Sequence, residues 1–307
     1  MLIVPFAKKM NWKKPPVVTI ALVLVNVLVF SFWQAGDGKR YEAAMHQYLH
    51  SSLPKIEFPR YEEFLRQHQQ NDDADTLAEM RTDPHAYPAI VQHLQHDAPF
   101  LRAMANGEVV KKGEPDFERW REDRRDFEEK FDKIVSEAHT FKPAFPEISD
   151  AFTHMFMHGG VMHLVGNMVF LLIVGLVVER LLGSGLYLIA YLTGGLIALA
   201  FFTAGNSDSA VPLLGASGAI AGMMGMYAAF FGKRRIPFFY SLGFYFDTVR
   251  APAWVLLIAW MGNEAYQLLT DDTSNVAYLA HFGGLLGGGL MGYLATHFQL
   301  VDAEELE

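Results

Sequence analysis

Two residues that could carry acyl-transfer chemistry lie inside apolar, glycine-rich runs. Ser217 lies in the run LLGASGAIAGMMGM, which begins at Leu213, and His281 lies in the run YLAHFGGLLGGGLMG, which begins at Tyr278. A serine hydroxyl becomes a nucleophile when an imidazole comes within roughly 2.6 to 3.2 Å and accepts its proton. Because water is scarce in such runs, Ser217 is either bonded back to its own helix or takes part in chemistry.

A second polar pair, His163 and Asn167, lies in the apolar run GGVMHLVGNMVFLL. Residues four apart share one helical face, and polar side chains inside a membrane face the bundle interior or a wet cavity. The pair therefore either forms hydrogen bonds between helices or presents two N–H donors to a developing negative charge, as in an oxyanion hole.

Two further histidines, His154 and His158, have the spacing that can share a metal on a helix. A zinc protease would need glutamate directly after the first of them, and Met155 is there instead. We therefore expect no zinc here, with both histidines bonded to loop backbone at the membrane surface.

Six apolar segments approach or reach the roughly 20 residues that a spanning helix needs. They are Val17–Trp33, Val161–Val178, Leu186–Ala204, Ala219–Phe231, Ala253–Leu269 and Ala277–Phe298. No small-residue cleavage site follows the first, which favours a retained anchor over a signal peptide. The chain is thus predicted to be an all-α polytopic membrane protein.

Glycines predict how two of these spans meet. Gly218 and Gly222 in the fourth span, and Gly284, Gly288 and Gly292 in the sixth, leave faces on which backbones can approach closely. Ser217 and His281 fall at similar depth, near the outer ends of that pair. Glu264 in the fifth span either orients His281 or lies at the outer interface.

Charge separates the chain into parts. Ala35–Asp150 holds 16 Lys and Arg against 24 Asp and Glu, a net of −8 out of the chain's −9. The balance argues against nucleic acid as a partner, and the absence of cysteine excludes disulfides and thiol chemistry. We expect four parts: residues 1–33 (cytoplasmic N-terminus and first span), 34–150 (extracytoplasmic insert), 151–298 (five-span core) and 299–307 (acidic tail).

Basic residues in short loops predict the orientation, because such loops stay cytoplasmic. Lysines precede the first span, Arg180 follows the second, and Lys233 to Arg235 follow the fourth. These loops lie on one side if there are six spans, which places the N-terminus in the cytoplasm and suits a bacterial inner membrane.

Within the insert, Asp116–Ala138 predicts a helix with an apolar stripe that Arg124 interrupts. That stripe could pack on the bundle's rim, on another part of the insert or on a second copy. The polar tract Gln67–Asp75 predicts a flexible linker. In the rest of the chain, Glu179–Arg180 predicts a helix-end salt bridge and cap, and Ile236–Phe246 an interfacial aromatic belt.

Four motifs in this order resemble the rhomboid family of intramembrane serine proteases. They are F-T-H-x-x-x-H-x-x-x-x-H-x-x-x-N from Phe152, E-R-L-L-G-S from Glu179, G-A-S-G from Gly215 and A-H-x-x-G from Ala280. The resemblance runs from Phe152 to about Leu294 and includes the first span. It says nothing about the insert.

The resemblance implies a six-helix bundle with Ser217 as nucleophile, His281 as general base, and an oxyanion hole of His163, Asn167 and the Ser217 backbone N–H. It also implies single-span membrane proteins as substrates, in a lipid bilayer, without metal or cofactor. The chain departs from the family in two places. Ser149–Asp150 stands where many members have a Trp-Arg pair, and the Trp120–Arg121 pair lies too far upstream to match it. Ala221 stands where some members have a tyrosine beneath the histidine.

Two other classes of function are weighed against a protease. A non-catalytic binder of transmembrane helices with this fold has no reason to hold both Ser217 and His281. A transporter is disfavoured because the sequence has no inverted repeat and no paired intramembrane charges.

Overall fold

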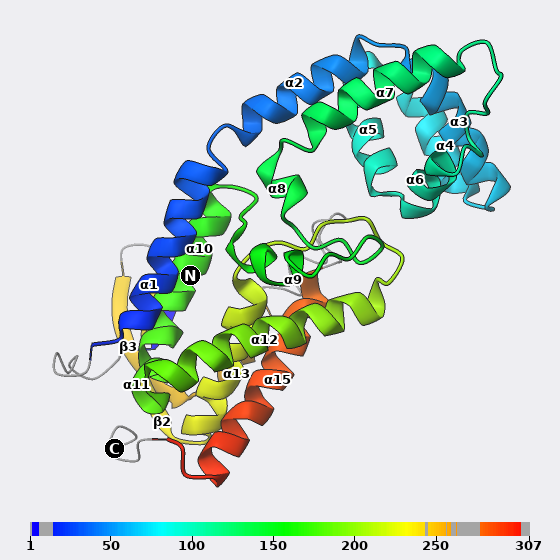
Figure 1. Ribbon diagram of the computed structural model, residues 1–307. Helices are drawn as coiled ribbons and strands as arrows, with labels where there is room; N and C mark the ends of the chain where they lie inside the picture. The colour runs from blue at the N-terminus through cyan, green and yellow to red at the C-terminus, as the bar shows by residue number, and fades with distance from the viewer. Residues whose placement is uncertain are drawn as a thin grey trace. The chain divides into compact units, whose positions relative to one another are not determined.

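The computed structural model describes residues 2–5, 15–242, 245–255, 257–258, 262 and 277–301 (Figure 1). The chain forms two compact units. The bundle unit comprises Met1–Phe32, Ile148–Asn206 and Leu213–Glu307. The insert unit comprises Trp33–Glu147 together with Ser207–Pro212, a short segment from much later in the chain.

Apolar helices make up most of the bundle unit. Helix α1 (Val17–Leu28) continues as the π-helix η1 (Val29–Trp33), and α10 (Val161–Phe170), η4 (Leu171–Gly175) and α11 (Leu176–Leu182) follow one another directly. The others are α12 (Ser184–Gly205), α13 (Ser217–Phe231) and α15 (Ala277–His297), with the short α9 (Asp150–Thr153) and η3 (His154–Phe156) before α10.

Within the described residues, two helices are long and apolar enough to cross a membrane: Val161–Leu182 and Ser184–Gly205. Val17–Trp33 passes the same test only together with the helix that follows it, and Ser217–Phe231 is apolar but shorter. Of the predicted fifth span, Ala253–Leu269, most residues lie outside the described part. The six-span count therefore stays a prediction.

The bundle unit also holds a small sheet that an all-α reading does not anticipate. Strands β1 (Leu2–Pro5), β2 (Arg235–Leu242) and β3 (Tyr245–Pro252) pair antiparallel in the order β1-β2-β3. The register sets Ile3 opposite Tyr240, and Phe239 opposite Thr248. Aromatic and β-branched residues favour strands, so the run predicted as an aromatic belt forms a hairpin.

Glycines let α13 and α15 pack backbone to backbone. A Cβ on Gly288 would lie 1.9 Å from the Gly222 carbonyl oxygen, and a Cβ on Gly284 would lie 2.3 Å from that of Gly218. No side chain fits at either position. This contact brings the start of α13 against the start of α15.

Glu179 caps another helix rather than only ending its own. Its carboxylate is buried and accepts hydrogen bonds from the backbone N–H groups of Val18 (2.9 Å) and Thr19 (2.7 Å) in the first turn of α1. The Ser184 hydroxyl donates a third, at 2.6 Å. A carboxylate at a helix N-terminus satisfies free donors and the helix dipole, so Glu179 fixes α1 to the rest of the bundle.

The insert unit is helical and has its own core. Its elements are α2 (Asp37–Leu49), α3 (Leu53–Gln67), α4 (Asn71–Met80), η2 (Pro84–Ala86), α5 (Tyr87–His96), α6 (Ala98–Ala105), α7 (Phe117–Phe131) and α8 (Val135–Ala138). Tyr48, Phe58, Phe100 and Phe127 are fully buried in that core. The apolar stripe of α7 thus packs inside the insert.

The flexible linker predicted at Gln67–Asp75 is wrong, because only three residues separate α3 from α4. Asp72 and Asp73 lie in the first turn of α4, where their charges favour the helix dipole. Ala74 and Leu77 are buried and hold the helix on the core.

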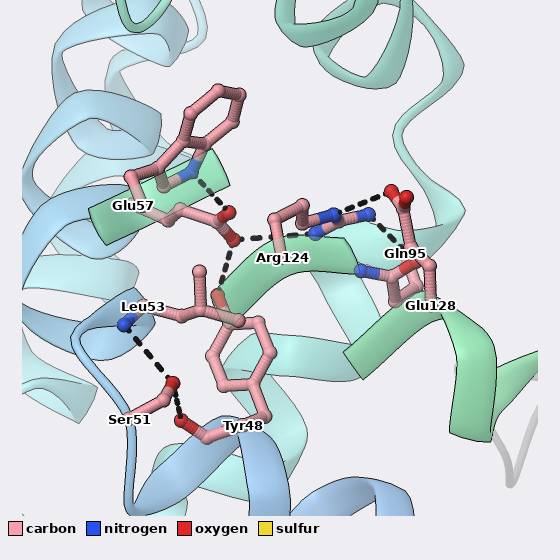
Figure 2. Close-up of polar contacts among 8 residues, drawn as sticks. Tyr48, Ser51, Leu53, Glu57, Gln95, Arg124 and Glu128 are labelled. Atoms are coloured by element: carbon pink, nitrogen blue, oxygen red, sulfur yellow. Dashed lines mark hydrogen bonds and ion pairs between the residues drawn. The ribbon is translucent and has the colours of Figure 1, made fainter. Parts of the chain in front are cut away.

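A buried ionic cluster explains why Arg124 interrupts the stripe of α7 (Figure 2). The carboxylate of Glu57 is fully buried and accepts hydrogen bonds from the Tyr48 hydroxyl at 2.6 Å and the Trp120 indole at 2.8 Å. The Arg124 guanidinium lies 3.3 Å from it and donates to Glu128 at 2.7 Å. Burial and then the charge of Glu57 raise the pKa of Tyr48, so Tyr48 stays a donor.

Candidate active site

Ser217 and His281 meet where α13 and α15 begin. The distance between Ser217 Oγ and His281 Nε2 is 2.7 Å, a hydrogen bond between side chains 64 residues apart in sequence. Both residues are half-buried. A neutral imidazole that accepts a hydroxyl hydrogen is the arrangement of a general base with its nucleophile.

The loop before Ser217 turns sharply at Gly215, whose φ is +115°. A side chain is disfavoured in that conformation, and a Cβ there would lie 2.9 Å from Cε1 of His163. The Gly215 N–H donates to the carbonyl oxygen of His154 at 2.8 Å. The serine loop is thus held against the turn that contains the histidines.

His163 and Asn167 project from α10 toward this loop. Asn167 is buried, and its Nδ2 has no hydrogen-bond partner among the residues that the structure describes. The Gly159 N–H donates to Nδ1 of His163 at 3.4 Å, so in the neutral ring Nε2 carries the hydrogen. Two side-chain donors thus lie close to Gly215: Nε2 of His163 is 3.0 Å and Nδ2 of Asn167 is 3.6 Å from its Cβ position.

His154 and His158 contact residues of this arrangement. Nδ1 of His154 is 2.9 Å from the carbonyl oxygen of Asp150, which is the first residue of α9 rather than a loop residue. The His158 ring is buried and meets the His163 ring edge to face, with 5.2 Å between centroids. Burial lowers the pKa of His154 and of His158 to about 4, so both rings are neutral at pH 7.

The motif spacing does not by itself reveal these supporting contacts. The carbonyl of His154 holds Gly215, and the ring of His158 fixes that of His163. Among the described side chains, no three of His, Asp or Glu are grouped as metal ligands.

The comparisons with known proteins concern this part of the chain. Residues 146–298 match the model of the rhomboid domain. The chain belongs to the rhomboid family. It is an integral membrane protein.

A curated relative is similar over part of its length. The chain is 32% identical over 138 residues to the rhomboid protease GluP of Bacillus subtilis (strain 168). The match covers 44% of this chain and 24% of GluP, so the chain spans about a quarter of the length of this relative.

The departures from many rhomboid sequences have structural counterparts. Ala221 is fully buried, and its Cβ would lie 3.1 Å from a Cβ on Gly284, so α15 approaches where a tyrosine would stand. Trp120 lies in the core of the insert unit, bonded to Glu57. The Trp120–Arg121 pair is therefore part of the insert rather than of the first motif.

Glu264, which the sequence places in the fifth span, lies outside the described residues. A third member of the site beside His281 therefore stays a hypothesis.

Proposed function

We propose that this rhomboid protein is an intramembrane serine protease with Ser217 as nucleophile and His281 as general base. The observation that carries the proposal is the 2.7 Å contact between Ser217 Oγ and His281 Nε2. Two comparisons support the proposal: the match to the rhomboid domain and the similarity to GluP, which is named a rhomboid protease.

In the first step, Nε2 of His281 takes the proton of the Ser217 hydroxyl while Oγ attacks the carbonyl carbon of a peptide bond. The carbonyl oxygen becomes an oxyanion, which the Ser217 backbone N–H, Nδ2 of Asn167 and Nε2 of His163 stabilise. Fixed donors aimed at a developing charge are worth more in a water-poor site than in water. The buried amide nitrogen of Asn167, which has no partner within the described part of the chain, suits this role, because an incoming oxyanion would satisfy it.

Acylation is complete when the imidazolium of His281 gives its proton to the leaving amine and the C–N bond breaks. An acyl-enzyme remains on Ser217. A water molecule, deprotonated by His281, then attacks the ester carbonyl. The imidazolium gives that proton to Oγ of Ser217 as the ester C–O bond breaks, which releases the second product. Acylation and deacylation each return His281 to its neutral state, and neither needs a metal or a cofactor.

The substrates we propose are single-span membrane proteins, cut in or near their transmembrane helices. In the proposed topology, six spans place the N-terminus in the cytoplasm of a bacterium, with the chain in the inner membrane. The insert and the dyad then lie toward the outer side. Water would reach the dyad from that side.

The decisive experiment uses the full chain purified in detergent with a single-span fusion substrate and, separately, a fluorophosphonate probe. We expect Ser217→Ala and His281→Ala to abolish both cleavage and labelling at unchanged expression. His297→Ala is the matched control, since His297 is an exposed histidine near the other end of the same helix, and it should retain full activity. Cleavage by the Ser217→Ala variant would refute the assignment.

A further inference from the structure

The loop before the serine is shared between the two units. Helix α12 ends at Gly205 and α13 begins at Ser217. Of the residues between them, Ser207–Pro212 belong to the insert unit and Leu213 onward to the bundle unit. We call Ser207–Pro212 the strap.

Several contacts fix the strap to the insert. The guanidinium of Arg102, near the end of α6, forms an ion pair with Asp208 and donates to the carbonyl oxygen of Ala144 at 3.2 Å. The Ala144 N–H in turn donates to the carbonyl oxygen of Ser209 at 3.0 Å. Figure 1 shows the loop after α12 running beside the segment that follows α8.

Ala210 is the most buried part of the strap, with 1% of its surface exposed. It lines a cavity of about 1130 Å³ along α7, together with Leu101, Met104 and Phe145. The Arg102 guanidinium also lies 5.5 Å from the Phe145 ring centroid. The strap is therefore held by an ion pair, a backbone hydrogen bond and a buried side chain.

The other end of the loop is held within the bundle. Leu213 packs against Ala198 and Phe202, and Gly215 donates to His154 at 2.8 Å. Only Val211 and Pro212 separate these contacts from those of the strap. Ser217 follows Asp208 by nine residues.

We propose that Arg102 and Asp208 are positioning residues for Ser217, so that the insert orders the loop that presents the nucleophile and its backbone N–H. This inference rests on the proposed protease function. Ordering one residue's backbone costs roughly 1 to 2 kcal/mol of conformational entropy. The contacts of the strap offset this cost in the free enzyme, before substrate binds. A shift of about 1 Å in a reacting group can cost 10²-fold in rate, which makes the loop's order matter for catalysis.

The test compares two arginines of the insert in the full-length protein. Arg102 and Arg121 are both exposed, each forms an ion pair, and each lies over a phenylalanine ring. Only the pair of Arg102 involves the strap, because Arg121 pairs with Glu118. We expect Arg102→Ala to lower kcat roughly three- to fivefold, the scale of a favourable exposed ion pair, with KM and the thermal unfolding midpoint unchanged.

Labelling of Ser217 by a fluorophosphonate should slow by the same factor, because no substrate is needed to detect the displaced serine. Arg121→Ala should match the wild type in every measurement. Asp208→Arg should be slower still through repulsion from Arg102, and the exchanged pair Arg102→Asp with Asp208→Arg should recover most of the rate.

Two results would overturn the inference: equal rates for Arg102→Ala and Arg121→Ala, or an exchanged pair no faster than Asp208→Arg alone. A wild-type protein that neither cleaves nor reacts with the probe would instead refute the proposed function. An active wild type with an inert Arg102 would refute only the role of the strap.

Discussion

The carbonyl oxygen of His154 accepts a hydrogen bond from the N–H of Gly215 at 2.8 Å. This bond joins the first histidine of the motif to the loop that ends at Ser217. His154 is itself held by Asp150, and Gly215 lies against His163. The nucleophile and the proposed oxyanion donors are thus ordered by one set of contacts.

Gly215→Ala should lower kcat by about 10²-fold, because the new Cβ would meet the His163 ring and the positive φ would be strained. Gly113→Ala is the matched control. Gly113 has a φ of +101° but nothing within 4 Å of its Cβ position. It should lose a little stability without losing activity. Equal rates for both variants would show that the contact with His163 is unimportant, and steady-state cleavage assays decide it.

His163→Ala and Asn167→Ala should each lower kcat by about 10²-fold with little change in KM, the scale of removing one oxyanion donor. The measurement is steady-state cleavage of the fusion substrate, alongside thermal unfolding in detergent. Unchanged rates in both variants would leave His163 and Asn167 as structural hydrogen-bonding residues between helices.

Gly288→Ala should separate α13 from α15, because its Cβ would lie 1.9 Å from the carbonyl oxygen of Gly222. We expect a lower unfolding temperature and loss of Ser217 labelling, since overpacking costs about 1 to 3 kcal/mol. Gly289→Ala, one residue along the same helix, has nothing within 4 Å of its Cβ position and should be neutral or slightly stabilising. If the two alanines behave alike, the close approach of the helices is not what holds the dyad together.

Glu57→Gln should destabilise the insert by about 3 kcal/mol, because it leaves Arg124 without its buried counter-charge. Glu128→Gln removes the other partner of Arg124, which is exposed, and should cost at most about 1 kcal/mol. Hydrogen exchange of peptides from α3 and α7 in the full chain measures the difference. Equal exchange in the two variants would mean that the buried cluster contributes nothing beyond an exposed pair.

Stability of the bundle should fall as the pH drops from about 6.5 toward 4. Burial holds the pKa of His154 and His158 at about 4, below their ordinary value of 6.5. Between these values the unfolded chain binds more protons, so acidification favours unfolding, by up to roughly 3 kcal/mol for each histidine. Unfolding midpoints measured from pH 7.5 to 4.5 should decline less steeply in His158→Phe. A slope unaltered by that substitution would contradict the linkage to His158.

The sequence alone determined which residues could react and which helices carry them. Ser217, His281, His163 and Asn167 stood out because polar groups inside apolar runs are costly and rarely idle. The helices that carry them, α10, α13 and α15, were also readable, since hydrophobic runs and glycine faces are local patterns. Their catalytic roles stay predictions, while the meeting of Ser217 with His281 is a structural observation.

Tertiary structure decided what depends on contacts between distant segments. Glu179 reads as a helix end, yet it caps α1, some 160 residues earlier. Arg124 interrupts an apolar stripe in the sequence, and only the structure shows that it pairs with the buried Glu57. The strap reads as part of an ordinary loop between spans, and only folding assigns it to the insert. Local periodicity carries no information about such pairings, because they depend on where the chain brings a donor, a charge or a cavity wall.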